Sequence, residues 1–178
     1  MDLDTFFVSC ERLLDSRLNG KPVLIGGTSD RGVVASCSYE ARKFGIHSAM
    51  PMRMARQLCP EAIVLRGDAS TYTKFSENVT DVIKDSVPLY EKTSVDEFYI
   101  DLTGMDKFFG CHKLASELRQ RIMRETGLPI SFGLSLNKTV SKIATGEAKP
   151  NNEIRVLTGD EKPFLAPLSV KKIPMVGD

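Results

Sequence analysis

The sequence predicts an α+β protein: a ferredoxin-like (split βαβ) antiparallel sheet backed by two helices, with residues 15–66 inserted as a smaller α/β unit. Two observations predict this class. Short β-branched and apolar runs alternate with segments whose apolar residues recur at helical spacing. With 178 residues, 42% of them apolar and 26% charged, the chain can bury one core plus a small subdomain.

Strands are expected where β-branched and apolar runs are bounded by turn residues. The run at 21–26 and the run at 32–36 are separated by a glycine-rich turn, which predicts a hairpin. Residues 91–103 read as two further strands that meet at a tight turn. The remaining expected strands are residues 2–4 and 130–135.

Helices are expected where apolar side chains share one face. Phe75, Val79, Val82 and Ile83 have this spacing. Proline at the first turn, glycine after the last turn and proline beyond the end mark helix boundaries elsewhere. The expected helices are residues 6–14, 39–44, 51–58, 71–86, 114–126 and 138–148.

Two acidic elements are candidates for a metal site. Asp96 and Glu97 are adjacent at the predicted turn, and they could share a cation only if the turn re-aims one of them, because neighbouring strand residues point to opposite faces. Asp2 and Asp4 lie two residues apart, on one face of a short strand. If the elements are side by side, their charge requires a hard cation such as Mg²⁺. Solvated strand-end acids are the alternative.

Composition excludes several classes of protein. No apolar run is long enough to cross a membrane and no secretory signal is present, so a cytoplasmic protein without a membrane partner is expected. The net charge of +1 provides no overall field for nucleic acid, so such binding must use local basic patches. Neither CxxC nor zinc-ligand spacing occurs, and the cysteines are expected to be reduced thiols. The residues concerned are Cys10, Cys37, Cys59, Cys111, His47 and His112.

Five segments together resemble the motifs of one known family. They are residues 2–7 (DLDTFF), 39–45 (YEARKFG), 94–101 (SVDEFYID), 133–138 (GLSLNK) and 148–151 (AKPN). In order and spacing they resemble the Y-family translesion DNA polymerases, in particular the DNA polymerase IV type. The resemblance covers essentially the whole chain. It implies a palm that holds two metal ions, an inserted fingers unit, and template-directed DNA synthesis past damaged bases.

The resemblance also implies a domain organisation. Residues 1–14 and 67–165 correspond to the palm and residues 15–66 to the fingers. Residues 166–178 resemble the start of a helix-hairpin-helix thumb, after which the sequence stops. Residues 1–178 are therefore expected to be a palm-and-fingers fragment. This fragment should fold, but it should be nearly inactive alone on primed DNA, because phosphate contacts dominate DNA affinity and most of them are expected in the thumb and the domain beyond it.

The same resemblance implies the roles of the acids. Asp2 and Asp96 bridge two Mg²⁺ ions, which Mn²⁺ can replace. Glu97 completes the site at the primer end, and Leu3 contributes its carbonyl oxygen. A pair of divalent ions suits phosphoryl transfer because it activates the attacking hydroxyl and neutralises the leaving pyrophosphate. Asp4 shares the strand face of Asp2 and could belong to the same acidic site, but a role in capping the helix that follows is equally expected.

Nucleotide binding is expected at a second group of residues. Tyr39 and Arg42 lie at positions i and i+3 of a short helix, so both can reach one anion. By resemblance Lys149 is a third phosphate ligand, and the aromatic ring of Phe7 excludes ribonucleotides. For an isolated Arg or Lys, a solvated surface charge is the alternative. The backbone N–H groups of Phe6 and Phe7, at a helix N-terminus, are expected to bind phosphate as well. The expected nucleotide-binding residues are therefore Phe6, Phe7, Ser36, Tyr39, Arg42 and Lys149.

The expected partners are primer-template DNA, a deoxynucleoside triphosphate and, through a C-terminal region beyond residue 178, a sliding clamp. Two alternatives remain. A nucleotidyl cyclase with a related palm needs paired glycines where this chain has Ser94 and Val95. A non-catalytic DNA-repair scaffold would be expected to lack the acids that are present here.

Overall fold

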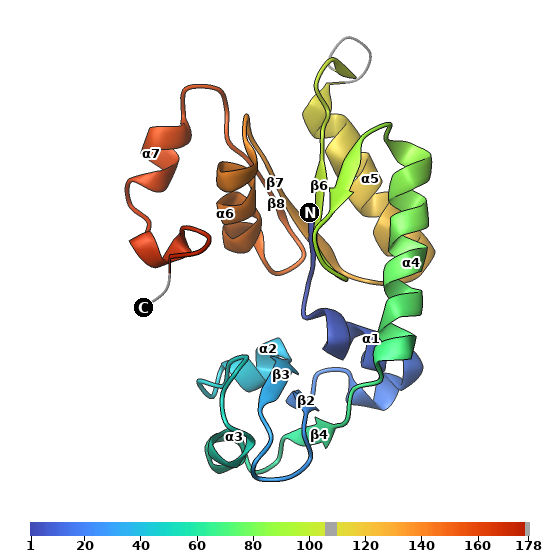
Figure 1. The fold of residues 1–178 in the computed structure, drawn as a ribbon, viewed down its shortest axis with the longest axis vertical. Coiled ribbons are helices and arrows are strands. Elements are labelled where there is room, and N and C mark those ends of the chain that lie inside the picture. The colour runs from blue at the N-terminus through green and yellow to red at the C-terminus, as the bar shows by residue number, and fades with distance from the viewer. Residues whose placement is uncertain (106–109, 177–178) are drawn as a thin grey trace. The chain divides into compact units, whose positions relative to one another are not determined.

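The structure, a computed structural model, describes residues 1–105 and 110–176 (Figure 1). The chain forms two compact units. The first comprises Met1–Asp4 and Ser76–Asp178, and the second, Thr5–Phe75, is inserted between these segments. The return to the first unit falls within helix α4 (Ala69–Ser86). Helix α1 (Phe6–Leu14) is grouped with the second unit. On the sequence alone, residues 1–14 were assigned to the palm.

The first unit is built on a mixed sheet. Antiparallel pairing joins β5 to β6 and β1 to β7, a backbone bridge between Asp2 and Glu97 joins β6 to β1, and β7 pairs with β8 in parallel. The predicted 91–103 hairpin is present. β8 was not anticipated, because three residues are too few to show a period. The strands, in spatial order, are β5 (Tyr90–Lys92), β6 (Phe98–Ile100), β1 (Asp2–Leu3), β7 (Ile130–Leu134) and β8 (Glu153–Arg155).

Helices α5 (Cys111–Thr126) and α6 (Lys138–Ala148) cover opposite faces of β7. The ring of Phe132 lies 6.1 Å from that of His112 in α5, measured between centroids. At the next residue, a Cβ atom placed on Gly133 would lie 2.5 Å from Cβ of Ala144 in α6. Because successive strand residues face opposite sides, the two contacts place the two helices on the two faces.

The close contact between β7 and α6 requires glycine at position 133. A Cβ atom there would lie 2.4 Å from the carbonyl oxygen of Ser141 and 2.5 Å from Cβ of Ala144. The helix itself begins at Asn137, whose side chain accepts a hydrogen bond from Val140 N at 2.9 Å. Helix α6 is therefore fixed both at its start and along the strand.

The second unit contains the predicted hairpin, β2 (Val23–Gly26) and β3 (Val34–Cys37), paired antiparallel. A third strand, β4 (Ile63–Leu65), pairs in parallel with β2 and was not anticipated. Besides α1, the unit contains α2 (Tyr39–Arg42) and α3 (Met52–Leu58). Its core consists of Leu24, Val34, Cys37, Ala41, Ile46, Met50, Met52, Ala55 and Cys59.

The remaining short elements are η1 (Ser16–Leu18), α7 (Glu161–Leu165) and η3 (Val170–Lys172). Of these elements, η3 lies within residues 166–178, the segment that resembles the start of a thumb. Residues 177 and 178 lie outside the described residues. Cys10, Cys37 and Cys59 are buried, and the partly exposed Cys111 donates from Sγ to the carbonyl oxygen of Leu102 at 3.2 Å. Among the described helices, none is long and apolar enough to cross a membrane.

Candidate active site

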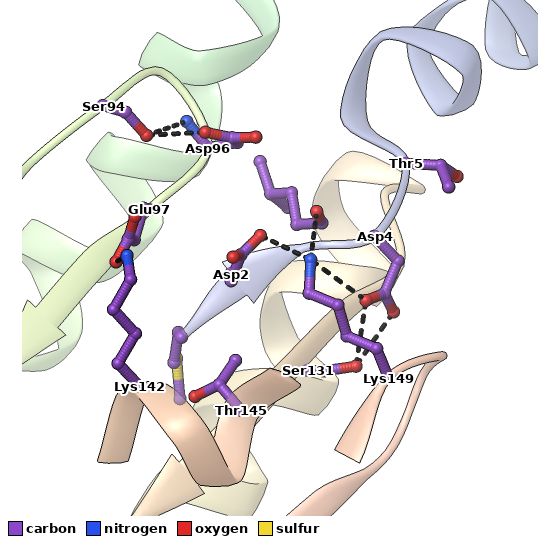
Figure 2. Close-up of polar contacts among 12 residues, drawn as sticks. Asp2, Asp4, Thr5, Ser94, Asp96, Glu97, Ser131, Lys142, Thr145 and Lys149 are labelled. Carbon is purple, nitrogen blue, oxygen red and sulfur yellow. Dashed lines mark hydrogen bonds and ion pairs between the residues drawn. The ribbon is translucent and has the colours of Figure 1, made fainter. Parts of the chain in front are cut away.

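Backbone pairing brings the two acidic elements together in the first unit. Leu3 N donates to the carbonyl oxygen of Asp96 at 3.0 Å, and Asp2 and Glu97 form an antiparallel bridge. Asp96 and Glu97 lie at the end of the turn that precedes β6, where Ser94 Oγ donates to Asp96 Oδ1 at 2.6 Å. Asp2, Asp96 and Glu97 thus occupy adjacent positions on neighbouring segments (Figure 2).

Two lysines pair with these acids. Lys149 Nζ lies 2.6 Å from Asp2 Oδ1 and donates to the carbonyl oxygen of Leu3 at 3.1 Å. Lys142 in α6 forms an ion pair with Glu97. Among residues 1–105 and 110–176, no group of three or more His, Cys, Asp or Glu side chains is disposed to hold a metal ion.

The electrostatics of the cluster favour an added cation. Burial raises the pKa of Asp2 above its usual value; Lys149 acts in the opposite direction, and the charges of Asp96 and Glu97 raise the pKa further. At Lys142, burial lowers the pKa, but the hydrogen bond and charge of Glu97 outweigh it, so the net shift is upward. The carboxylates therefore repel one another, although lysines neutralise part of their charge.

The donor atoms have the chemistry of a magnesium site. Asp2, Asp96 and Glu97 offer carboxylate oxygens and Leu3 offers a carbonyl oxygen, which are the ligands that hard divalent cations prefer. The ammonium group of Lys149 already contacts two of these oxygens, on Asp2 and Leu3. The donor atoms therefore fit Mg²⁺ by their chemistry, whereas the carboxylates of the described residues are not gathered around one point.

Asp4 differs from the other acids. Its side chain is buried, it is hydrogen-bonded to Ser131 and Asn151, and it lies after the end of β1. The N-cap residue of α1 is Thr5, whose backbone φ of 41° turns the chain after the strand and whose side chain makes no capping bond. Asp4 thus lies apart from the bridged positions of Asp2 and Glu97.

A cleft of about 940 Å³ in the first unit adjoins the acids. Asp2 and Glu97 line it, together with Tyr99, Lys138 and Lys142. Lys142 and Lys138 were not singled out from the sequence, because an isolated lysine is usually a solvated surface charge. The available signal was that Lys138 ends the 133–138 motif and that Lys142 lies between this motif and the one at 148–151.

In the second unit, Phe6 is buried and Phe7 is partly exposed. The Phe7 ring stacks on Tyr72 with centroids 4.5 Å apart and an interplanar angle of 21°. The Tyr72 hydroxyl donates to Glu11 Oε1 at 2.7 Å. Tyr72 was missed in the sequence, because a contact across more than sixty residues leaves no local pattern.

The structure places Tyr39 and Arg42 together on α2, with the Arg42 guanidinium carbon 5.0 Å from the centre of the Tyr39 ring. Ser38 caps this helix by accepting from Ala41 N at 3.2 Å. Ser36 lies on β3 and is partly buried.

An ion pair between Arg12 of α1 and Glu40 links helix α2 to the rest of the second unit. Glu40 Oε2 lies 2.8 Å from the Arg12 guanidinium, which also donates to the carbonyl oxygen of Lys21 at 3.0 Å. Burial raises the pKa of Glu40, but the hydrogen bond from Arg12 and further donors outweigh it, so the net shift is downward. The helix is therefore held by a carboxylate that stays ionised.

Comparison with known proteins gives consistent matches. The impB/mucB/samB family pattern matches residues 1–146. DNA polymerase IV of Treponema denticola is 47% identical over 178 residues, which cover 99% of this chain and 45% of that protein. DNA polymerase IV of Dehalococcoides mccartyi strain CBDB1 is 44% identical over 179 residues, which cover 99% of this chain and 46% of that protein. The chain spans about half the length of the curated relatives it matches.

Solved structures agree. The insertion ternary complex of Dbh DNA polymerase matches with a TM-score of 0.91 and 31% identity, over 99% of this chain and 53% of that chain. DinB from Sulfolobus solfataricus matches with a TM-score of 0.91 and 30% identity over the same shares. These matches confirm the predicted fold class, a polymerase palm with an inserted fingers unit.

Proposed function

The chain belongs to the impB/mucB/samB family, and from this membership we propose that it carries the catalytic part of a DNA-directed DNA polymerase that copies damaged templates. The reaction is transfer of a nucleotide from a deoxynucleoside triphosphate to the 3′-hydroxyl of a primer. The observation that carries the proposal is the pairing that places Asp2, Asp96 and Glu97 on adjacent backbone positions. No finding favours the nucleotidyl cyclase or the non-catalytic scaffold.

Each acid has a proposed role. Asp2 and Asp96 would hold the two Mg²⁺ ions, with Glu97 as a further ligand at the primer end and the carbonyl oxygen of Leu3 as a fourth donor. When bound, such a pair of ions activates the attacking hydroxyl and neutralises the departing pyrophosphate. The chemistry of the donor oxygens and the raised pKa of Asp2 support this assignment. Mn²⁺ is proposed as a substitute.

The triphosphate is proposed to bind cationic groups and N–H donors. Lys149 is one ligand, supported by its position beside Asp2. Tyr39 and Arg42 share α2, and their contact supports action on one anion. Phe7 is proposed to exclude ribonucleotides by its ring. The N–H groups of Phe6 and Phe7 and the hydroxyl of Ser36 complete the proposed set.

The partners proposed are primer-template DNA, the deoxynucleoside triphosphate and a sliding clamp, with the cytoplasm as the place of action. We assign the unit that contains β5–β6–β1–β7–β8 to the palm and the unit that contains β3–β2–β4 to the fingers. Residues 166–178 are assigned to the start of a thumb.

The test replaces the acids without changing their size. Asp96→Asn with Glu97→Gln should weaken binding of Mn²⁺ to the nucleotide-free protein, measured by electron paramagnetic resonance, and should abolish primer extension in a protein of the relatives' full length. Asp101→Asn is the matched control, because Asp101 is an exposed carboxylate after the same hairpin and accepts from Thr103 N. Near-normal extension by the double variant would refute the assignment.

A further inference from the structure

Asp4 is a buried carboxylate whose partners come from distant parts of the chain. It is 1% exposed. Both of its oxygens lie 3.0 Å from Ser131 Oγ, which donates to them from β7. Oδ2 also accepts from Asn151 N at 2.6 Å. A carboxylate is buried at this depth only when donors satisfy it, so these contacts are part of what keeps the group in place.

The same contacts reach Lys149. Asn151, two residues after Lys149, has a φ of 47°, an uncommon conformation for a residue other than glycine. Its N–H is bound by Asp4, and Asn152 N donates to Ser131 Oγ at 3.2 Å. Lys149 Nζ itself lies 3.7 Å from Asp4 Oδ1 (Figure 2). Asp4 thus contacts both the side chain and the following backbone of this lysine segment.

We propose that Asp4 is a positioning residue that holds Lys149 for phosphate binding, and that it is not a metal ligand. This inference rests on the proposed function, in which Lys149 binds the triphosphate. Asp2 and Asp4 then have different roles, metal binding for Asp2 and positioning of Lys149 for Asp4. Asp2 lies at the bridged position beside Glu97, whereas the oxygens of Asp4 are bound by Ser131 and Asn151 from within the protein.

The charge of Asp4 matters as well as its hydrogen bonds. Lys149 is shared between Asp2 at 2.6 Å and Asp4 at 3.7 Å. A cation bound by Asp2 would compete with Lys149 for that carboxylate, and Lys149 would then keep Asp4 as its carboxylate partner. An ammonium group held by a buried carboxylate is pre-organised, so less entropy is lost when it binds an anion.

A double-mutant cycle tests the inference. Binding of deoxyadenosine triphosphate with Mg²⁺, without DNA, is measured by calorimetry for the wild type, Asp4→Ala, Lys149→Met and the double variant. Both single variants should weaken binding roughly tenfold, the usual scale for residues that orient a ligand-binding group. The double variant should bind no more weakly than Lys149→Met, because Asp4 acts through that lysine. Asp4→Asn should be intermediate, since its oxygen can still accept from Asn151 N.

A control separates positioning from lost stability. Ser86→Ala removes a hydrogen bond in the same unit but away from the acids and Lys149, the one that Arg121 Nη1 in α5 donates to Ser86 Oγ in α4 at 2.8 Å. It should lower the melting temperature and leave nucleotide affinity unchanged. Asp4→Asn also serves if Asp4→Ala does not fold, because Arg119 holds the segment independently by donating to Asn151 Oδ1 at 2.7 Å.

The outcomes are distinguishable. Unchanged or tighter binding by Asp4→Ala and Asp4→Asn, or additive losses in the double variant, would overturn the positioning role while leaving the proposed function intact. Unchanged binding by Lys149→Met would contradict the proposed function itself, and the inference would fall with it.

Discussion

At the scale of single residues, environment decides what each carboxylate can do. Asp2 and Asp4 are two residues apart, yet one lies beside Asp96 and Glu97 and the other is enclosed by Ser131 and Asn151. Burial raises the pKa of Asp2, and its pairing with a lysine does not fully compensate. A carboxyl group whose pKa is raised by burial and by neighbouring carboxylates is characteristic of a functional site.

The raised pKa of Asp2 predicts a pH-dependent effect of Asp2→Asn. The stability that protonated Asp2 supplies is full below its ordinary pKa of 3.8 and is lost as pH rises through the raised value. Ionised Asp2 therefore lowers the free energy of unfolding at neutral pH. Without metal, Asp2→Asn should raise the melting temperature by a few degrees at pH 7.5, and the difference should disappear near pH 3.

Thermal unfolding followed by circular dichroism, with a chelator present, measures this difference. Added Mg²⁺ should stabilise the wild type more than the variant, because it binds the folded state through Asp2. A variant less stable than the wild type at pH 7.5 would show that the attraction of Lys149 exceeds the cost of burial.

Phe7→Ala is predicted to admit ribonucleotides. Phe7 is partly exposed and stacks on Tyr72, so truncation should cost on the order of 1–2 kcal/mol of stability, less than for a fully buried aromatic. The measurement is the ratio of ribonucleotide to deoxynucleotide incorporation in a protein of the relatives' full length. Tyr72→Phe is the control, because it keeps the stacked ring and removes only the bond to Glu11. An unchanged ratio in a folded Phe7→Ala protein would place the discrimination elsewhere.

At the scale of elements, the site depends on how closely α6 approaches β7. Gly133 allows this approach, and the helix then presents Lys142 to Glu97 and is followed by the segment that carries Lys149. Thr145 and Ser141 on the same helix contact the strand backbone or the loop after it. A shift of α6 would therefore move both lysines relative to β1.

Gly133→Ala is predicted to destabilise the protein by about 2–3 kcal/mol, because its methyl group would overlap helix backbone that cannot yield easily. Gly146→Ala is the matched control within α6. Its added Cβ meets no atom within 4 Å, and it should stabilise the helix by about 0.5–1 kcal/mol. Urea unfolding measures both changes. Equal stabilities of Gly133→Ala and the wild type would show that the contact is looser than described.

At the scale of the whole molecule, two units share one chain and the charges nearly balance, with 24 Lys and Arg against 23 Asp and Glu. Many of the cations are paired within the protein, including Lys142 and Lys149 at the site itself. Attraction to a polyanion must therefore come from a few local groups and not from an overall field.

Residues 1–178 are predicted to bind primed duplex DNA weakly, with a Kd on the order of 10 μM or above at physiological salt. Because the contacts are to phosphates, affinity should fall steeply as salt rises. Fluorescence anisotropy of a labelled duplex at several salt concentrations measures this. Nanomolar binding that is insensitive to salt would contradict the prediction.

The sequence by itself determined the elements with a clear period and the motifs that resemble one family. The helix expected at 71–86 is α4 (Ala69–Ser86), and that at 138–148 is α6 with the same bounds. The hairpin around residues 26–34 and the turn that carries Asp96 and Glu97 were also predictable. Such features depend on neighbouring residues, whose spacing the sequence displays directly.

Only the tertiary structure decided which groups meet. The pairing of Asp4 with Ser131 spans 127 residues, and that of Lys149 with Asp2 spans 147. Strand β4 pairs in parallel with β2, and strand β8 pairs in parallel with β7. Each has three residues, and neither was recognised from the sequence. Strand register and helix packing, which sum many weak long-range contacts, set these distances. Two aspartates that look equivalent in the sequence therefore acquire different partners in the fold.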